Sequence, residues 1–391
     1  MSTVKASMYF DDYNLELLEN EGHYTLKIDS YYGKAKKVVI PASIGDIPVT
    51  VIGNCAFLLR ESLENVILSV NIEIIEDSAF KACSNLKEIY LPEGLTSIED
   101  SAFKDCTNLR EINLPESLTS IKDYAFNNCE RLANVKFPEN LVSIGDEAFR
   151  NCKKITNITI PKGLISIGCD TFFGCINLKE FIVDRENPAF TSCDGVIFDK
   201  NMTTLIMCPN GKEGEYIIPE SIVNVEFTAF RYCNKLTKLI FPKEFMTLPH
   251  NSLYFCEQLE DISVNESNPL FSSVNGVLLD KEGSRLFQYP QNKGNTNYHV
   301  PNKVKEIEKC AFYNCRWLTK IILPESLIII RDKVFRSCEQ LSEITLPESL
   351  LHIGDEAFID CPNLKTITLS RKTKIGYGTF NGFSGQIIYR D

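Results

Sequence analysis

Fifteen cysteines are the most reactive side chains of this 391-residue chain, and thiols in that number could form disulfides, hold a metal or supply a nucleophile. Most of them recur at a spacing of 23 residues. The recurring residues are Cys83, Cys106, Cys129, Cys152 and Cys175, then Cys233 and Cys256, then Cys315, Cys338 and Cys361. No C-x-x-C pair occurs, and the four histidines are scattered, so the ligand spacing of a zinc site is missing. The spacing therefore indicates a repeated structural unit.

The sequence also lacks the motifs of other kinds of catalysis. The sequence contains no G-x-x-x-x-G-K phosphate loop, no G-x-G-x-x-G after a strand and no G-x-S-x-G elbow. Recurring carboxylates directly follow a proline, where solvated turn residues are expected; they are Glu93, Glu116, Glu139, Glu220, Glu325 and Glu348. We therefore predict no catalytic residues, no metal site and no bound cofactor.

A phenylalanine three residues before most of these cysteines sets the register of the repeat. Twelve such anchors occur, one of them a leucine: Phe57, Phe80, Phe103, Phe126, Phe149, Phe172, Phe230, Leu253, Phe312, Phe335, Phe358 and Phe380. The unit reads L-x-x-I-x-L-P-x-x-L-x-x-I-G-x-x-A-F-x-x-C. Its I-x-L alternation is typical of a short strand with two inward side chains, and the proline ends the hydrogen-bonded ladder. The glycine after the second extended segment is expected to use a positive φ.

A single unit cannot bury its own apolar side chains, so the units must stack as coils of a solenoid with one continuous core. A rise of roughly 5 Å per coil gives twelve anchors a length of ~50–60 Å. The recurring cysteine lies between apolar residues, where it is expected to behave as a small buried hydrophobe. So many free thiols fit a reducing compartment or an anaerobic habitat better than an oxidising one.

Two parts of the chain depart from the unit. Residues 1–37 alternate apolar and polar positions and are expected to form a β cap on the solenoid of residues 38–391. Two of the steps between anchors are long, and the extra residues, about 184–217 and 265–300, are copies of one another with Asp-Gly or Asn-Gly turns. We expect β-hairpin insertions there, either as an irregular form of the repeat or as projections that grip a ligand.

Composition limits the functions that fit. The net charge of -11 disfavours nucleic acid as a partner. No apolar run reaches the roughly 18 residues of a membrane-spanning helix. The first twenty residues contain no apolar core of a secretory signal, although a mature chain with its leader removed would look the same.

The repeat resembles the BspA-like (Treponema pallidum-type) leucine-rich repeats, with LKEIYLPEGLTSIEDSAFKDC and LSEITLPESLLHIGDEAFIDC matching almost position by position. The resemblance runs from about residue 38 to the C-terminus. It implies a right-handed, β-rich leucine-rich repeat solenoid of about 12 coils. It also implies a secreted or cell-surface protein that adheres to host or extracellular-matrix proteins.

In leucine-rich repeat solenoids the outward strand positions form a concave sheet that commonly binds partners. The apolar members of the central outward row are candidates for partner binding here: Tyr90, Ile182, Ile240 and Ile322. The alternative is that these residues only favour strand formation.

A non-catalytic protein-binding or adhesion module is the leading hypothesis for the function. A carbohydrate-binding surface protein is the alternative, although Tyr90 is the one aromatic platform in the row. A polysaccharide-active β-helix enzyme is a third hypothesis, which lacks visible clusters of catalytic residues. The sequence leaves the partner and the oligomeric state open.

Overall fold

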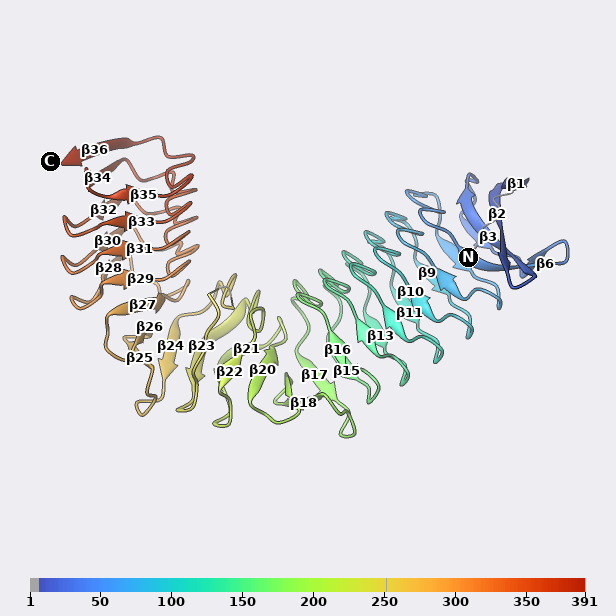
Figure 1. Ribbon diagram of the computed structural model, residues 1–391, viewed down its shortest axis with the longest axis horizontal. Coiled ribbons are helices and arrows are strands. Elements are labelled where there is room, and N and C mark those ends of the chain that lie inside the picture. The colour runs from blue at the N-terminus through green and yellow to red at the C-terminus, as the bar shows by residue number, and fades with distance from the viewer. Residues whose placement is uncertain (1–6, 251, 391) are drawn as a thin grey trace. The chain divides into compact units, whose positions relative to one another are not determined.

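The structure is a computed structural model that describes residues 7–250 and 252–390, without the side chains of residues 7–9. Residues 1–6 of the expected cap, and residue 391, lie outside the described residues. The described residues form 36 strands and no helix. They divide into two compact units, which are described separately: unit 1 is residues 1–200 with 209–211, and unit 2 is residues 201–208 with 212–391. In each unit the coils lie side by side (Figure 1).

Unit 1 begins with three antiparallel strands, the last of which pairs in parallel with the strand Ile47–Ile52. The first sheet has the order β1(Ser7–Phe10), β2(Tyr13–Asn20), β3(His23–Tyr31), β6(Ile47–Ile52), β8(Ile74–Ile75), β10(Ser97–Ile98), β12(Ser120–Ile121), β14(Ser143–Ile144), β16(Ser166–Ile167), with β5(Ser43–Ile44) on β6. The L-x-x-I-x-L segments form a second sheet of β4(Lys37–Val39), β7(Asn65–Ile67), β9(Glu88–Tyr90), β11(Glu111–Asn113) and β13(Asn134–Lys136). Two further strands, β15(Asn157–Ile160) and β17(Glu180–Val183), pair in parallel, and β18(Phe190–Cys193) and β19(Val196–Asp199) form an antiparallel hairpin.

Unit 2 repeats this arrangement. On one side of its coils β20(Thr204–Met207) pairs with β22(Asn224–Val225), and β27(Arg285–Gln288), β29(Glu306–Ile307), β31(Ile329–Ile330), β33(His352–Ile353) and β35(Lys374–Ile375) form a parallel ladder. On the other side the parallel groups are β21(Glu213–Ile217), β23(Lys235–Phe241), β24(Asp261–Val264); β28(Asn297–His299), β30(Lys320–Ile322), β32(Glu343–Thr345); and β34(Thr366–Ser370), β36(Gln386–Arg390). A hairpin of β25(Phe271–Val274) and β26(Val277–Asp280) precedes β27.

The anchor phenylalanines form continuous stacks in the core. In unit 1 the ring of Tyr31, at the end of β3, stacks on Phe57, and the stack then runs to Phe172 with centroid separations of 4.8–5.7 Å. This separation matches both the spacing of neighbouring strands, ~4.7–4.9 Å, and the distance at which offset aromatic rings attract. Strand pairing and ring stacking therefore favour the same rise per coil, and the predicted solenoid with a single apolar core is confirmed in each unit.

The recurring cysteines are buried, as predicted, and they also donate hydrogen bonds. The Cys129 Sγ lies 3.2 Å from the carbonyl oxygen of Phe103 in the preceding coil, and that oxygen also accepts the N–H of Cys106. The same thiol-to-carbonyl bond recurs along the chain, at Cys83, Cys106, Cys152, Cys175, Cys256, Cys338 and Cys361. The thiol thus supplies a second donor to a carbonyl that has two lone pairs to satisfy in the core.

The expected positive φ at the repeat glycines is wrong. Gly145 and Gly168 do not adopt it, whereas the non-glycine residues Ser101 and Asp105 do, with φ of 56° and 62°. The N–H groups of these two residues each donate to a carbonyl of the next coil at 2.8 Å, which holds the turn in place. At Gly145 the requirement is space, because a Cβ there would lie 2.6 Å from the backbone nitrogen of Asp123.

Each long step contains a hairpin and a further coil. In the segment 265–300 the strands β25 and β26 form the hairpin, while β27 and β28 pair in parallel with β29 and β30 of the next coil. Tyr289 takes the anchor position, with its ring 5.1 Å from that of Phe312. In the segment 184–217 the strands β20 and β21 likewise pair with β22 and β23. The expected hairpin therefore accounts for only part of each segment. Each segment also contains a coil that lacks the A-F-x-x-C signature, so the number of coils exceeds the twelve counted from the anchors.

The thiol hydrogen bond gives a first prediction. Replacing Cys129 with alanine should lower the free energy of unfolding by about 1–2 kcal/mol, because it removes a buried sulfur and one donor to the Phe103 carbonyl. The control Cys55→Ala changes an exposed cysteine and should shift stability by less than about 0.5 kcal/mol. Urea denaturation followed by circular dichroism measures both, and equal shifts would contradict a role for the buried thiol.

Burial also predicts which thiols react. Loss of solvent raises the pKa of the Cys106, Cys129 and Cys152 thiols well above the ordinary value, so these groups stay protonated and unreactive at pH 8. Cys55, Cys169 and Cys193 are exposed. Alkylation of the folded protein with iodoacetamide at pH 8 should therefore modify three thiols quickly and the other twelve only after unfolding, as counted by mass spectrometry. Rapid modification of the recurring cysteines in the folded state would show that the core is open.

Candidate binding face

The four candidate residues lie at the outward positions of their strands. In unit 1 Tyr90 and Ile182 are 53% and 48% exposed, at the end of β9 and within β17. In unit 2 Ile322 is 37% exposed, whereas Ile240 in β23 is partly buried. The intervening residues, such as Ile89, face the core. The alternation read from the sequence therefore places the row on the surface.

The structure does not gather the four residues into one patch. Tyr90 and Ile182 belong to different sheets of unit 1, and Ile240 and Ile322 belong to different sheets of unit 2. Each of the four residues is paired with different residues on the adjacent strands, and those paired residues decide whether an apolar surface forms around it.

Tyr90 is part of an apolar patch on three adjacent strands of unit 1. The register pairs Val39 with Ile67 and Ile67 with Tyr90. Val39 is 57% exposed, and Ile67 is partly exposed between its two neighbours. Because directly paired residues on one sheet face lie within contact distance, these three side chains form a continuous surface, here called the unit 1 patch.

A row of charges flanks the unit 1 patch. The Glu64 carboxylate accepts from Lys87 and pairs with Lys36 at 2.9 Å, so these three side chains alternate in sign across neighbouring coils. The hydrogen bonds from Lys87 and Lys36 lower the pKa of Glu64 to about 2, which keeps it ionised. An apolar centre with an ionised border is the usual anatomy of a protein interface.

Unit 2 contains a comparable surface around Ile240. The register pairs Ile217 with Ile240, and Ile217 is 62% exposed. Both line an open hollow of about 400 Å³, together with Pro242 and Asn265. This surface is here called the unit 2 patch. Ile322 is paired with His299 and Thr345, so its surroundings are polar.

Sequence reasoning missed Val39 and Ile217. Val39 precedes the first anchor and lies outside the 23-residue register. Ile217 lies 23 residues before Ile240, but its segment lacks the phenylalanine anchor and was interpreted as a hairpin. Both nevertheless stand two residues before a proline, in Val38-Val39-Ile40-Pro41 and Tyr216-Ile217-Ile218-Pro219. A search for the apolar-x-apolar-proline signature without the phenylalanine would have found them.

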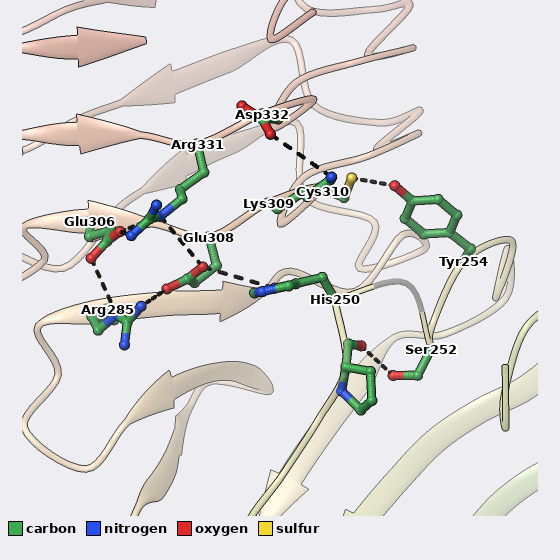
Figure 2. A network of polar contacts seen from close by, with 11 residues as sticks. His250, Ser252, Tyr254, Arg285, Glu306, Glu308, Lys309, Cys310, Arg331 and Asp332 are labelled. Atoms are coloured by element: carbon green, nitrogen blue, oxygen red, sulfur yellow. Dashed lines mark hydrogen bonds and ion pairs between the residues drawn. The ribbon is translucent and has the colours of Figure 1, made fainter. Parts of the chain in front are cut away.

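A second polar region of unit 2 surrounds the buried carboxylate of Glu308 (Figure 2). Glu308 is 2% exposed and accepts from Arg285, while the Arg331 Nε lies 3.8 Å away and the His250 Nδ1 3.9 Å away. Glu306 pairs with the same two arginines, at 3.3 Å from the Arg285 Nε. Two arginines and two glutamates thus neutralise one another.

These charges form one wall of an open hollow of about 610 Å³, whose other lining residues include Met246, Phe271 and Phe287. The arginines are already paired, so the hollow does not present free positive charge to an anion. Nearby, Tyr254 stacks on Tyr313 at 4.8 Å and its hydroxyl contacts the Cys310 sulfur (Figure 2). The contacts of Tyr254 with Tyr313 and Cys310 join residues more than fifty positions apart and bridge the coils on either side of the second long step. We therefore assign these contacts to the stability of the fold.

The glutamates that were expected to be solvated are exposed in the structure. Each of the glutamates that follows a repeat proline is exposed: Glu93, Glu116, Glu139, Glu220, Glu325 and Glu348. Over the described part of the chain, no three His, Cys, Asp or Glu side chains are grouped as metal ligands would be. Within the same residues, no helix has the length and apolar character needed to cross a membrane.

Stacked parallel coils with an L-x-x-I-x-L strand in each define a leucine-rich repeat solenoid. A family model described as the BspA type leucine rich repeat region, in six copies, matches residues 30–155, 96–208, 207–274 and 283–388. The chain therefore belongs to the BspA-type leucine-rich repeat family.

Two solved structures show the same fold. A leucine-rich repeat protein from Eubacterium ventriosum is 21% identical, with a TM-score of 0.60 over 91% of this chain and 95% of its own. A leucine rich cell surface protein from Faecalibacterium prausnitzii is 22% identical, with a TM-score of 0.54 over 99% of this chain and 95% of its own. No curated protein matches the sequence.

The buried carboxylate gives a prediction for stability. Glu308→Ala should lower the free energy of unfolding by about 2 kcal/mol, because it removes the buried acceptor of Arg285 and leaves Glu306 as the one carboxylate facing the two arginines. The matched control Glu325→Ala removes an exposed carboxylate and should cost less than about 0.5 kcal/mol. Chemical denaturation of both variants provides the comparison. Indistinguishable midpoints would show that the Glu308 network contributes nothing to stability.

Proposed function

We propose that this protein is a non-catalytic binding module that engages a protein partner through the outward face of its L-x-x-I-x-L strands. The anchors would come from the row Tyr90, Ile182, Ile240 and Ile322, extended by Val39 and Ile217. The observation that carries the proposal is the unit 1 patch, where register alone aligns Val39, Ile67 and Tyr90 at the surface.

Physical reasoning supports this assignment. Isolated exposed apolar residues are common and need no explanation, whereas side chains aligned on adjacent strands produce a contiguous surface that gains free energy when a partner covers it. Tyrosine is enriched among the residues that dominate binding energy. The ionised row of Lys36, Glu64 and Lys87 beside the patch would set the orientation of the partner more than its affinity.

Family membership is consistent with the proposal. One structural neighbour is described as a cell surface protein, and a surface location for this chain would bring the patches into contact with host or extracellular-matrix proteins. Binding without catalysis agrees with the exposed position of the recurring glutamates.

The test begins with a screen of purified extracellular-matrix proteins for a partner, followed by isothermal titration calorimetry. The double variant Val39→Asp with Tyr90→Asp should weaken binding by about 2 kcal/mol or more, since it places charge in the apolar centre of the interface. Both side chains already face water, so circular dichroism should show an intact fold. A second double variant, Ile182→Asp with Ile322→Asp, probes two further members of the row.

A matched control uses the same residue types elsewhere. Val70→Asp with Tyr377→Asp introduces identical changes at side chains that are 75% and 81% exposed and lie outside the row. This variant should bind as the unchanged protein does. If both double variants of the outward row also bind normally, the unit 1 patch, on which the proposal rests, is not the binding site.

A further inference from the structure

The outward sheet of unit 1 is interrupted between β13 and β15. The strands β4, β7, β9, β11 and β13 form one paired sheet, and β15 pairs only with β17. On the opposite side of the same coils, β14 and β16 pair without interruption, and the rings of Phe126, Phe149 and Phe172 remain stacked. The two coils are thus held together in the core and separate only at the outward face.

A change of side chain accompanies the interruption. The second inward position of the strand is leucine in the two preceding coils, Leu91 and Leu114, but it is Phe137 here. The Phe137 ring is buried and packs edge-on against Phe149, at a centroid distance of 5.5 Å and an angle of 62°. At the same place Val135 is partly exposed, whereas its counterpart Ile112 is buried.

The separation opens a hollow of about 270 Å³ in the face. Its polar lining consists of Asn113, Asn134, Lys136, Thr156, Asn157 and Thr159, and its remaining lining residues are aliphatic. Among the described residues, the side chains of Asn113, Asn134 and Lys136 form no hydrogen bond or ion pair. By contrast, Lys153 of the next coil is paired with Glu130 at 2.8 Å.

We infer that this hollow binds a single sugar unit of a glycan, with a preference for an acidic sugar. Amide groups and hydroxyls are donors and acceptors at once, which suits the hydroxyl groups of a sugar ring. The lining contains no carboxylate and one ammonium group, so Lys136 favours a sugar that carries a carboxylate. The partly exposed Val135 offers an apolar contact for the ring carbons. A volume just below the ~300–1,000 Å³ of drug-sized sites limits the occupant to about one ring.

An inserted peptide strand does not fit the same place. A strand between β13 and β15 would require two inter-strand spacings, or roughly 9.6 Å. The two strands keep Cα atoms within 8 Å of each other, which is too close for a strand between them. An extended peptide is therefore disfavoured, and it serves below as an alternative outcome.

The experiment uses the full chain and saturation-transfer difference NMR with two probes. One is a hyaluronan tetrasaccharide, which alternates glucuronic acid and N-acetylglucosamine, and the other is the neutral N-acetylglucosamine tetramer. Both should bind, the acidic probe about threefold more tightly through Lys136. Asn134→Ala with Asn157→Ala should weaken both probes about tenfold or more. Lys136→Gln should remove the preference for the acidic probe and leave the neutral one unchanged.

The control Asn20→Ala with Asn54→Ala makes the same change at exposed asparagines outside the hollow and should leave both affinities as they were. Failure of either sugar to bind the unchanged protein, or equal affinity in the Asn134/Asn157 variant, would overturn the proposal. Binding of a tetraglutamate peptide in place of the sugars would overturn it too. None of these outcomes affects the test of the protein-binding patches, because no residue is shared between the two sets of variants.

Discussion

The structure depends on the requirement that each coil be covered by another coil. A unit of 23 residues has two unpaired strand edges and a set of apolar side chains that its own backbone cannot enclose. Stacking satisfies both needs at one rise, because paired strands and offset aromatic rings favour almost the same separation. The thiol ladder adds to this constraint. Eight of the ten recurring cysteines donate to the phenylalanine carbonyl of the preceding coil, so the interior hydrogen bonds also repeat at the interval of the sequence.

This constraint leaves few positions for function. Inward positions are determined by packing, and the turn positions by backbone hydrogen bonds between coils, as at Ser101 and Asp105. At the outward strand positions, neither packing nor backbone hydrogen bonding determines which side chain is present. Apolar residues at these positions gain nothing from the core. Where register aligns several of them, as at Val39, Ile67 and Tyr90, the result is a surface that a partner would complete.

The irregular places of the solenoid coincide with local substitutions. Phe137 replaces leucine where the core stays stacked and the outward sheet is interrupted. Tyr289 in place of phenylalanine continues the ring stack in a coil that lacks the usual turn, and the coils on either side are then joined by the contacts around Glu308 and Tyr254. In both cases the core interaction is retained, and the difference appears at the surface, where new chemistry can be accommodated.

The sequence by itself determined the repeat, its inward and outward positions and the burial of the cysteines, because a fixed period leaves each side chain only one orientation. The fold and the family followed from that period. The sequence did not show that the glycines serve close approach, since this depends on a neighbouring coil at Asp123. It also missed Val39, Ile217 and the coil around Tyr289, whose signatures are incomplete. Which outward residues become neighbours, and where the sheet separates, was decided only by the tertiary structure, because both depend on how successive coils pair.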